Sequence, residues 1–304
     1  MSGTAILLMA FGGPESLDEV GPFMAKLMGR PPAPQIIERV TERYRTIGGS
    51  SPLARIVREQ ALALEQVLAG DISPVVRPAF KYAEPSIAKV VAELASQGFE
   101  RIVGISVSPH YSRISTGAYF NELREAIQGK DVELATVDGY YAQPAFLDAI
   151  AEKVRLALSK LEDQHCNDSY LVFTAHSLPT EYIEQGDPYI QQIQETIDGV
   201  MQRVPGYRWR LAYQSRGMGQ GQWLEPQVEA TLEELAASGQ NRIVLVPISF
   251  TCDHIETLYD IDVVIANKAK GLGLKFVRTE ALNTSKLFID ALAAAVQPYI
   301  APVG

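Results

Sequence analysis

The sequence of 304 residues has few cysteines: Cys166 and Cys252 are the only two, and they lie far apart along the chain. Two distant thiols do not make a disulfide framework, and they cannot supply the four thiolate ligands of an iron–sulfur cluster. We therefore expect a reducing compartment, the cytoplasm, and no iron–sulfur cluster.

The sequence also lacks a long hydrophobic run. No stretch reaches the roughly 18 to 20 apolar residues that a membrane-spanning helix needs. The first apolar run, Ala5–Phe11, has no basic segment before it and leads into Gly-Gly-Pro, so it predicts a strand rather than a signal peptide. We expect no transmembrane segment, and peripheral contact with a membrane stays open only through a surface patch.

Positive charge is scarce as well. The formal net charge of −9 at pH 7 argues against general binding of nucleic acid or of an anionic membrane. With 47% hydrophobic and 21% charged residues, the composition is that of a globular protein, and the length suffices for two domains. We expect a monomer that acts on small molecules or cations, without nucleic acid.

Two glycine-rich segments lack the usual phosphate-binding motifs. "FGGPES" (11–16) and "RYRTIGGSSPLARI" (43–56) do not match G-x-G-x-x-G, and neither ends in the Gly-Lys-Ser/Thr of a P-loop. Paired glycines equally allow a flat ligand to approach the backbone, with Arg43, Arg45 and Arg55 available for its carboxylates. Nucleotide binding is therefore disfavoured.

Short apolar runs alternate with segments of helical periodicity. The runs are Ala5–Phe11, Val75–Tyr82, Ile102–Val107, Leu134–Val137, Tyr170–Thr174, Trp209–Tyr213, Ile243–Phe250 and Lys275–Arg278. Between them, Ser86–Ser96 and Pro226–Ala237 repeat apolar residues at spacings of three and four. This alternation predicts the α/β class, with parallel sheets covered on both faces.

The chain also resembles itself. "EPSIAKVVAELASQGFERIVGISVS" from Glu84 matches "EPQVEATLEELAASGQNRIVLVPIS" from Glu225, displaced by 141 positions. One duplication of this length indicates two similar doubly wound halves rather than a solenoid. We expect an N-terminal domain of residues 1–145 and a C-terminal domain of residues 146–304, and we consider that the last helix packs back on the first domain.

His176 follows an apolar run in "TAHSLPTE" (174–181). Ligands of open parallel sheets bind beyond the carboxyl ends of the strands, where His176 is expected to lie. A histidine there can act as a proton acceptor near neutral pH, or it can simply bond to local backbone. Its position alone leaves both readings open.

Acidic residues gather in "SFTCDHIETLYDID" (249–262). On a helix, Glu256 and Asp260 share a face with Asp253, and these like charges repel unless a cation or a raised pKa relieves them. Alternatively, Asp253 caps the helix, Glu256 favours its dipole and Asp260 is solvated. No C-x-x-C or H-x-x-x-H pattern supports a closed zinc site, so weak and open ligation of a passing metal fits better.

Seven segments in this order resemble the ferrochelatase family: "GGPES", "RYRTIGGSSPL", "SPHYS…STG", "TAHSLP", "GDPY", "WLEPQ" and "SFTCDHIETLYDID". The resemblance implies two Rossmann-like, type II chelatase-like domains around a cleft. It implies an enzyme that inserts Fe²⁺ into a porphyrin, protoporphyrin IX or coproporphyrin III, with release of two protons at a late step of haem synthesis. Iron is then a substrate, and no tightly bound cofactor is expected.

The resemblance also assigns site residues. It makes His176 and Glu256 catalytic, places His176, Glu256 and Asp260 on the metal, and places Phe11, Arg43, Ser51, Tyr111 and Trp223 at the porphyrin or its support. The sequence departs from the family pattern at Phe11, where many short bacterial members have a tyrosine, and at Val264, where some have a glutamate. Only Lys26 and Arg30 remain of a basic cluster found in coproporphyrin-using relatives.

Two other functions stay open. A chelatase of another metal or tetrapyrrole, such as cobalt with a corrin precursor, shares the fold. A protein that binds a tetrapyrrole without reacting it needs shape and propionate contacts, but it needs no base beside an acidic row. Pairing of His176 with Glu256 therefore favours the enzyme.

Overall fold

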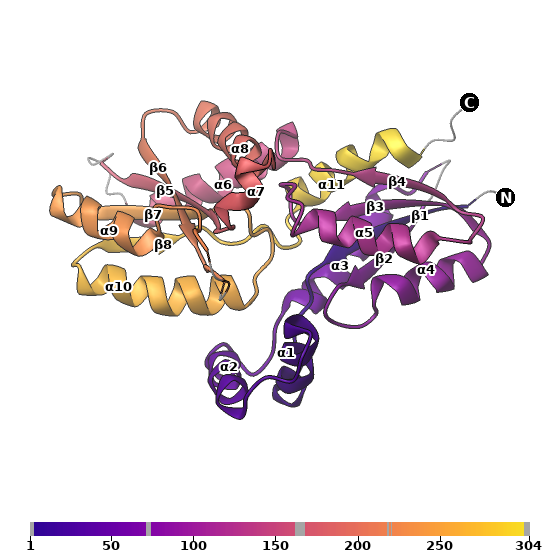
Figure 1. The fold of residues 1–304 in the computed structure, drawn as a ribbon. Helices are drawn as coiled ribbons and strands as arrows, with labels where there is room; N and C mark the ends of the chain where they lie inside the picture. The colour runs from indigo at the N-terminus through magenta and orange to yellow at the C-terminus, as the bar shows by residue number, and fades with distance from the viewer. Residues whose placement is uncertain (1–2, 71–73, 162–167, 218, 220, 301–304) are drawn as a thin grey trace.

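The structure is a computed structural model that describes residues 3–70, 74–161, 168–217, 219 and 221–300. The described chain forms two parallel sheets of four strands each, which lie side by side (Figure 1). The strands are β1 (Gly3–Ala10), β2 (Val75–Phe80), β3 (Phe99–Ser106), β4 (Glu133–Val137), β5 (Tyr170–His176), β6 (Arg208–Gln214), β7 (Arg242–Pro247) and β8 (Lys275–Arg278). Each apolar run that predicted a strand overlaps one of them, with ends that differ by up to three residues.

The two sheets have the same topology. The strand orders are β2-β1-β3-β4 and β6-β5-β7-β8, and every pairing is parallel. The duplication extends to the helices, since α4 (Ile87–Ser96) and α9 (Val228–Ala237) have bounds displaced by the same 141 positions. The predicted α/β class with two similar doubly wound halves is confirmed.

Helices cover both faces of both sheets. The remaining α-helices are α1 (Val20–Met28), α2 (Pro34–Thr46), α3 (Leu53–Val67), α5 (Thr116–Ile127), α6 (Pro144–Leu161), α7 (Thr180–Glu184), α8 (Tyr189–Arg203), α10 (Ala266–Gly271) and α11 (Lys286–Ile300). A short 3₁₀-helix, η1 (Leu17–Glu19), precedes α1, and a π-helix, η2 (Glu256–Ile265), precedes α10.

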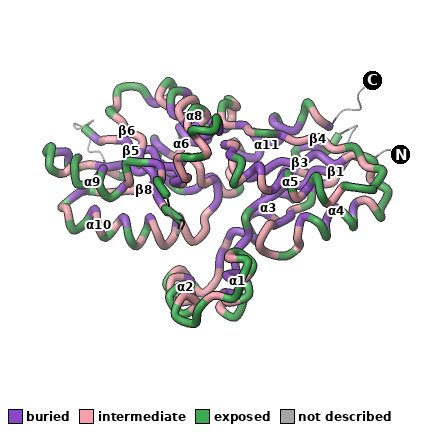
Figure 2. The backbone as a smooth tube through the Cα atoms, in the orientation of Figure 1, coloured by how far each residue is buried: buried purple, intermediate pink, exposed green. Residues whose placement is uncertain are grey.

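Burial on both faces explains why the strands read as continuous apolar runs. In β1, Ile6 and Leu8 face the core that contains α3, whereas Leu7 and Met9 face α4 and α5, and all four are fully buried. Burying each such side chain contributes roughly 1.5 to 3 kcal/mol. The strands form the buried centre of each half (Figure 2).

One hydrophobic core continues from the first sheet to the second. It includes side chains of α3, α6, α8 and α11, and α11 contacts both α3 and α6. The last helix therefore touches elements of both halves. Helix α6 begins at Pro144 and contacts α8, β7 and β8, and the predicted boundary between residues 145 and 146 lies in its first turn. That boundary stays a prediction.

Helices α1 and α2 form a hairpin that projects from the sheets (Figure 1) and is largely exposed (Figure 2). Although the hairpin belongs to the first half of the chain, α2 contacts η2 of the second half. The hairpin thereby closes one side of the space between the halves.

Candidate active site

A cavity of about 650 Å³ opens between the two halves. Its wall includes residues at the carboxyl ends of parallel strands: Phe11 after β1, Val107 after β3, Ser215 after β6, and His176, the last residue of β5. This is the edge where ligands of open parallel sheets bind. The volume also lies within the roughly 300 to 1,000 Å³ of small-molecule sites.

His176 is held firmly at this wall. Its backbone N–H donates to Ser249 Oγ at 3.1 Å, and its backbone carbonyl oxygen accepts from the hydroxyl of Tyr189 at 3.2 Å. Its ring is perpendicular to that of Phe250, with centroids 6.2 Å apart. The imidazole Nδ1 lies 2.9 Å from Glu256 Oε2. The structure thus brings together two residues that are 80 positions apart.

The charges of this pair stabilise one another. Burial lowers the pKa of His176, but the charge and hydrogen bond of Glu256 and the charge of Asp260 outweigh burial, so the pKa is raised above 6.5. Burial raises the pKa of Glu256, but His176 and His254 lower it overall. Ionised Glu256 accepts a hydrogen bond from Nδ1–H of His176, so the lone pair of the neutral imidazole is on Nε2. The pair is an oriented base.

Asp260 is the second carboxylate of the cavity wall. Ser215 Oγ donates to its Oδ2 at 2.8 Å, and Arg43 Nη1 lies 3.9 Å from its Oδ1. Burial raises the pKa of Asp260, Ser215 lowers it, Glu256 raises it and Arg43 lowers it, and the net shift is upward. The raised pKa partly relieves the repulsion that the sequence predicts between the two carboxylates.

Both carboxylates lie on the π-helix η2. A π-helix has i→i+5 hydrogen bonds, so its turn takes more residues than the 3.6 of an α-helix, and residues four apart come close to one full turn. Glu256 and Asp260 consequently lie on one face. The N-terminal cap of η2 is Ile255, and no side chain caps this end, so Asp253 is not the capping residue. The predicted helix is thus present, in a wider form than expected.

The remaining wall is mainly apolar and includes three cations. The apolar side chains include Phe11, Met24, Leu27, Met28, Leu53, Ile114 and Leu178, and the cations are Arg43, Lys81 and Arg216. Lys81 Nζ lies 3.2 Å from a carboxylate oxygen of Glu122. Such a wall suits a flat apolar molecule that carries carboxylates.

Three of the predicted substrate residues do not line the cavity. Ser51 is buried, and the N–H of Tyr111 donates to Gln192 Oε1 at 2.7 Å. Trp223 lies against Gly217, where a Cβ would come within 2.6 Å of the indole, and Gly217 itself is part of the wall. None of these three residues lines the cavity, whereas Phe11, Arg43, His176, Glu256 and Asp260 do.

Ser215 and His254 also line the cavity, although the family resemblance assigns neither of them a role. Ser215 has a φ of 58°, a conformation uncommon outside glycine that is often retained at functional sites. His254 Nδ1 donates to the carbonyl oxygen of Cys252 at 2.9 Å, which leaves Nε2 as the acceptor of the neutral ring. Ser215 directly follows β6, whereas His254 lies in the loop between β7 and η2.

The described residues contain no group of three or more His, Cys, Asp or Glu side chains arranged to hold a metal ion. Of the cysteines, Cys252 is buried with a free thiol, and burial raises its pKa to about 11. Cys166 lies outside the described residues. No helix in the described part of the chain has the length and apolarity to span a membrane.

Two parallel α/β halves around a cavity give the chain a type II chelatase-like fold. The fold agrees with that of SirB from Bacillus subtilis with Fe³⁺, with a TM-score of 0.63, 12% identity, and coverage of 98% of this chain and 96% of the other.

The chain belongs to the ferrochelatase family, whose model matches residues 3–299. It is 40% identical to the ferrochelatase of Geobacter sp. (strain M21), over 97% of this chain and 98% of the relative. It is 39% identical to that of Citrifermentans bemidjiense, with the same coverage.

Proposed function

We propose that the protein inserts Fe²⁺ into a porphyrin, protoporphyrin IX or coproporphyrin III, at a late step of haem synthesis. Membership of the ferrochelatase family supports this reaction class. The observation that carries the proposal is the 2.9 Å contact between His176 Nδ1 and Glu256 Oε2 at the wall of the cavity. Insertion releases two protons, so the site needs a base, and it receives a dication, so it needs negative charge.

His176 is the proposed base. Because Glu256 binds Nδ1, Nε2 of the neutral ring is the atom that accepts a pyrrole proton. Protonation gives an imidazolium beside an ionised carboxylate, a pair in which each charge stabilises the other. Glu256 thus orients the base before the transfer and stabilises its product afterwards.

The carboxylates provide the proposed route for iron. Asp260 follows Glu256 along one face of η2, and Val264, four residues further, is 43% exposed. The row of carboxylates therefore ends at Asp260, about one helical turn before the exposed Val264. His176, Glu256 and Asp260 are not arranged as a closed metal site in the described chain. We propose that the two carboxylates, and His176 before it takes up a proton, bind Fe²⁺ only weakly and pass it to the four nitrogens of the macrocycle.

The porphyrin is proposed to lie against the apolar wall. Phe11 is tilted against Tyr82, with ring centroids 4.7 Å apart, and presents carbon where a tyrosine would present oxygen. No oxygen ligand for iron is then available from Phe11. Arg43, Lys81 and Arg216 are the cations available for propionates. Ser51, Tyr111 and Trp223 act as supports behind this surface.

The remaining parts of the proposal concern partners and place. We infer a cytoplasmic monomer that takes porphyrin and ferrous iron, binds no nucleic acid and keeps no tightly bound cofactor or iron–sulfur cluster. The net charge of −9 supports the first exclusion. Sedimentation of the purified protein tests whether it is a monomer. An assay for inorganic sulfide tests whether it holds an iron–sulfur cluster.

The decisive experiment supplies Fe²⁺ without oxygen to the purified protein together with either porphyrin, and follows the loss of free-base fluorescence. Parallel reactions with Co²⁺ and Zn²⁺ measure metal preference. We expect catalytic turnover of one of the two porphyrins. Tight binding of porphyrin with no turnover for any metal would indicate a tetrapyrrole-binding protein, and turnover with Co²⁺ but not Fe²⁺ would indicate a cobalt chelatase.

A further inference from the structure

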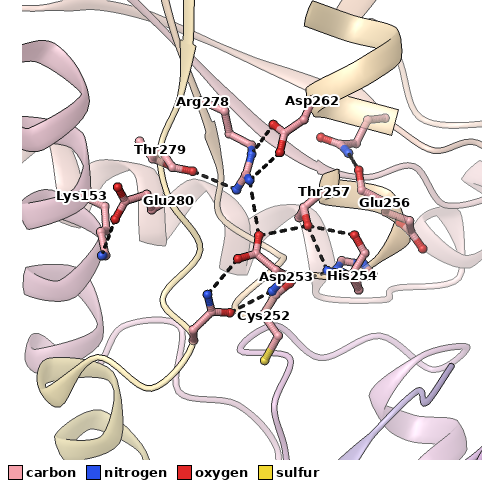
Figure 3. A network of polar contacts seen from close by, with 12 residues as sticks. Lys153, Cys252, Asp253, His254, Glu256, Thr257, Asp262, Arg278, Thr279 and Glu280 are labelled. Carbon is pink, nitrogen blue, oxygen red and sulfur yellow. Dashed lines mark hydrogen bonds and ion pairs between the residues drawn. The ribbon is translucent and has the colours of Figure 1, made fainter. Parts of the chain in front are cut away.

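A polar network beside the cavity fixes the helix that carries Glu256 and Asp260. Arg278 ends the edge strand β8 and makes a bidentate contact with Asp262 of η2: Nε to Oδ1 at 2.7 Å and Nη2 to Oδ2 at 2.8 Å (Figure 3). Nη2 is also 3.3 Å from Oδ1 of Asp253, which precedes the helix. The guanidinium of Arg278 thus contacts both Asp253, which precedes η2, and Asp262, which lies within it.

Asp253 is itself fully engaged. Its Oδ2 accepts from Asn283 Nδ2 at 2.8 Å, and its N–H donates to Asn283 Oδ1 at 2.9 Å. The hydroxyl of Thr257 donates to its Oδ1 at 3.3 Å, and that hydroxyl accepts the N–H of His254 at 3.0 Å. The first turn, which includes Glu256, is therefore held from outside the helix.

The network is anchored on rigid elements of both halves. Asn283 has a φ of 44°, its N–H donates to Thr251 O at 2.8 Å, and its carbonyl oxygen accepts from Gln60 Nε2 of α3 at 2.7 Å. The Arg278 side chain is only 12% exposed, and its backbone pairs in register with Leu245 of β7. None of Arg278, Asp262 and Asn283 lines the cavity.

The duplicated half supplies an internal comparison. The displacement of 141 positions places Val137, the last residue of β4, opposite Arg278, and Asn121 opposite Asp262. The corresponding helix, α5 (Thr116–Ile127), is an ordinary α-helix. The arginine clamp and the π-helix thus occur together in the half that carries the carboxylates, and both are lacking at the matching place in the other half.

We propose that Arg278 is a positioning residue that, through Asp262 and Asp253, holds η2 in its π form and so fixes Glu256 against His176. π-Helices are rare, and they occur mostly as single turns inside α-helices. A π-helix of ten residues needs contacts that oppose its rewinding to the α form. Rewinding would change the relative directions of Glu256 and Asp260 without moving the apolar wall.

The inference rests on the proposed function, and its test has two separate readouts. Arg278→Lys keeps the charge but removes the planar fork, and Arg278→Met removes both. The matched control is Arg210→Lys, on the other edge strand of the same sheet, where Arg210 binds Glu234 of α9 at 2.7 Å.

The first readout is kinetic. Small displacements of a catalytic group cost up to about 10²-fold in rate. We expect both Arg278 variants to lose about that factor in kcat, with KM for porphyrin changed only a fewfold. Arg210→Lys should remain at the wild-type rate. Wild-type kcat in both Arg278 variants would overturn the proposal, as would recovery of the full rate in Arg278→Lys.

The second readout needs no turnover. Amide hydrogen exchange should accelerate over residues 255–265 in the Arg278 variants and stay unchanged there in Arg210→Lys. Unchanged exchange refutes the clamp even if the enzyme is active, and faster exchange supports it even if no porphyrin is turned over. If Arg278→Met does not fold, Asp262→Asn removes the charge and one of the two acceptor oxygens of the Arg278 contact, and it is judged by the same two readouts.

Discussion

Replacing Glu256 by Gln keeps the size of the side chain and removes one negative charge. The amide oxygen can still accept from His176 Nδ1, so the variant loses only the difference between a charged and a neutral hydrogen bond. Charged bonds contribute about 1.5 to 3 kcal/mol and neutral ones about 0.5 to 1.5, a difference of about 1 to 1.5 kcal/mol. At about 1.36 kcal/mol per factor of ten, kcat should fall roughly 5- to 15-fold.

The substitution should have a larger effect on KM for Fe²⁺ than on kcat. A unit charge pair separated by 4 Å is worth about 4 kcal/mol at an effective dielectric constant of about 20. That exceeds the loss in hydrogen bonding, so we expect KM for Fe²⁺ to rise by more than kcat falls. The pKa of His176 should also fall, because Glu256 is the main influence that raises it.

The assay measures initial rates against Fe²⁺ concentration at saturating porphyrin, without oxygen, at several pH values. Glu234→Gln, at an exposed carboxylate of the same half, is the control. If the Glu256→Gln enzyme matches wild type at every Fe²⁺ concentration and keeps the same pH midpoint, Glu256 neither guides the metal nor tunes His176. It would then be a residue of the helix start.

Three further results are expected. His176→Ala should lower insertion by about 10² to 10⁴-fold with the fold retained in circular dichroism, because it removes the base; activity within a fewfold of wild type would exclude that role. The base must be neutral to accept a proton and its pKa is raised above 6.5, so the rate should fall as pH falls through a midpoint above 6.5; a flat profile between roughly 5.5 and 8 would require another base. An N-alkylated porphyrin, already bent, should bind more tightly than the flat substrate, since a bent ring exposes a pyrrole proton to the base; weaker binding in a fluorescence titration would argue against distortion.

The sequence by itself determined much of the fold, because the relevant signals are local. Strands buried on both faces read as apolar runs, and every such run became a strand. The displacement of 141 positions revealed the duplication, and it recurs in the bounds of α4 and α9. His176 and the acidic segment were recognisable because a strand-end histidine and closely spaced carboxylates are visible in one stretch of sequence.

Only the tertiary structure decided which of these residues meet. The 2.9 Å contact of His176 with Glu256 joins the end of β5 to the start of η2, and its distance depends on how η2 is wound. The winding of η2 depends on a residue distant in sequence, because Arg278 of β8 contacts Asp262 of this helix. No periodicity in residues 249–262 predicts a π-helix. Ser51, Tyr111 and Trp223 carried signals as good as that of Arg43, yet they do not line the cavity, because exposure to a cavity is set by the packing of both halves.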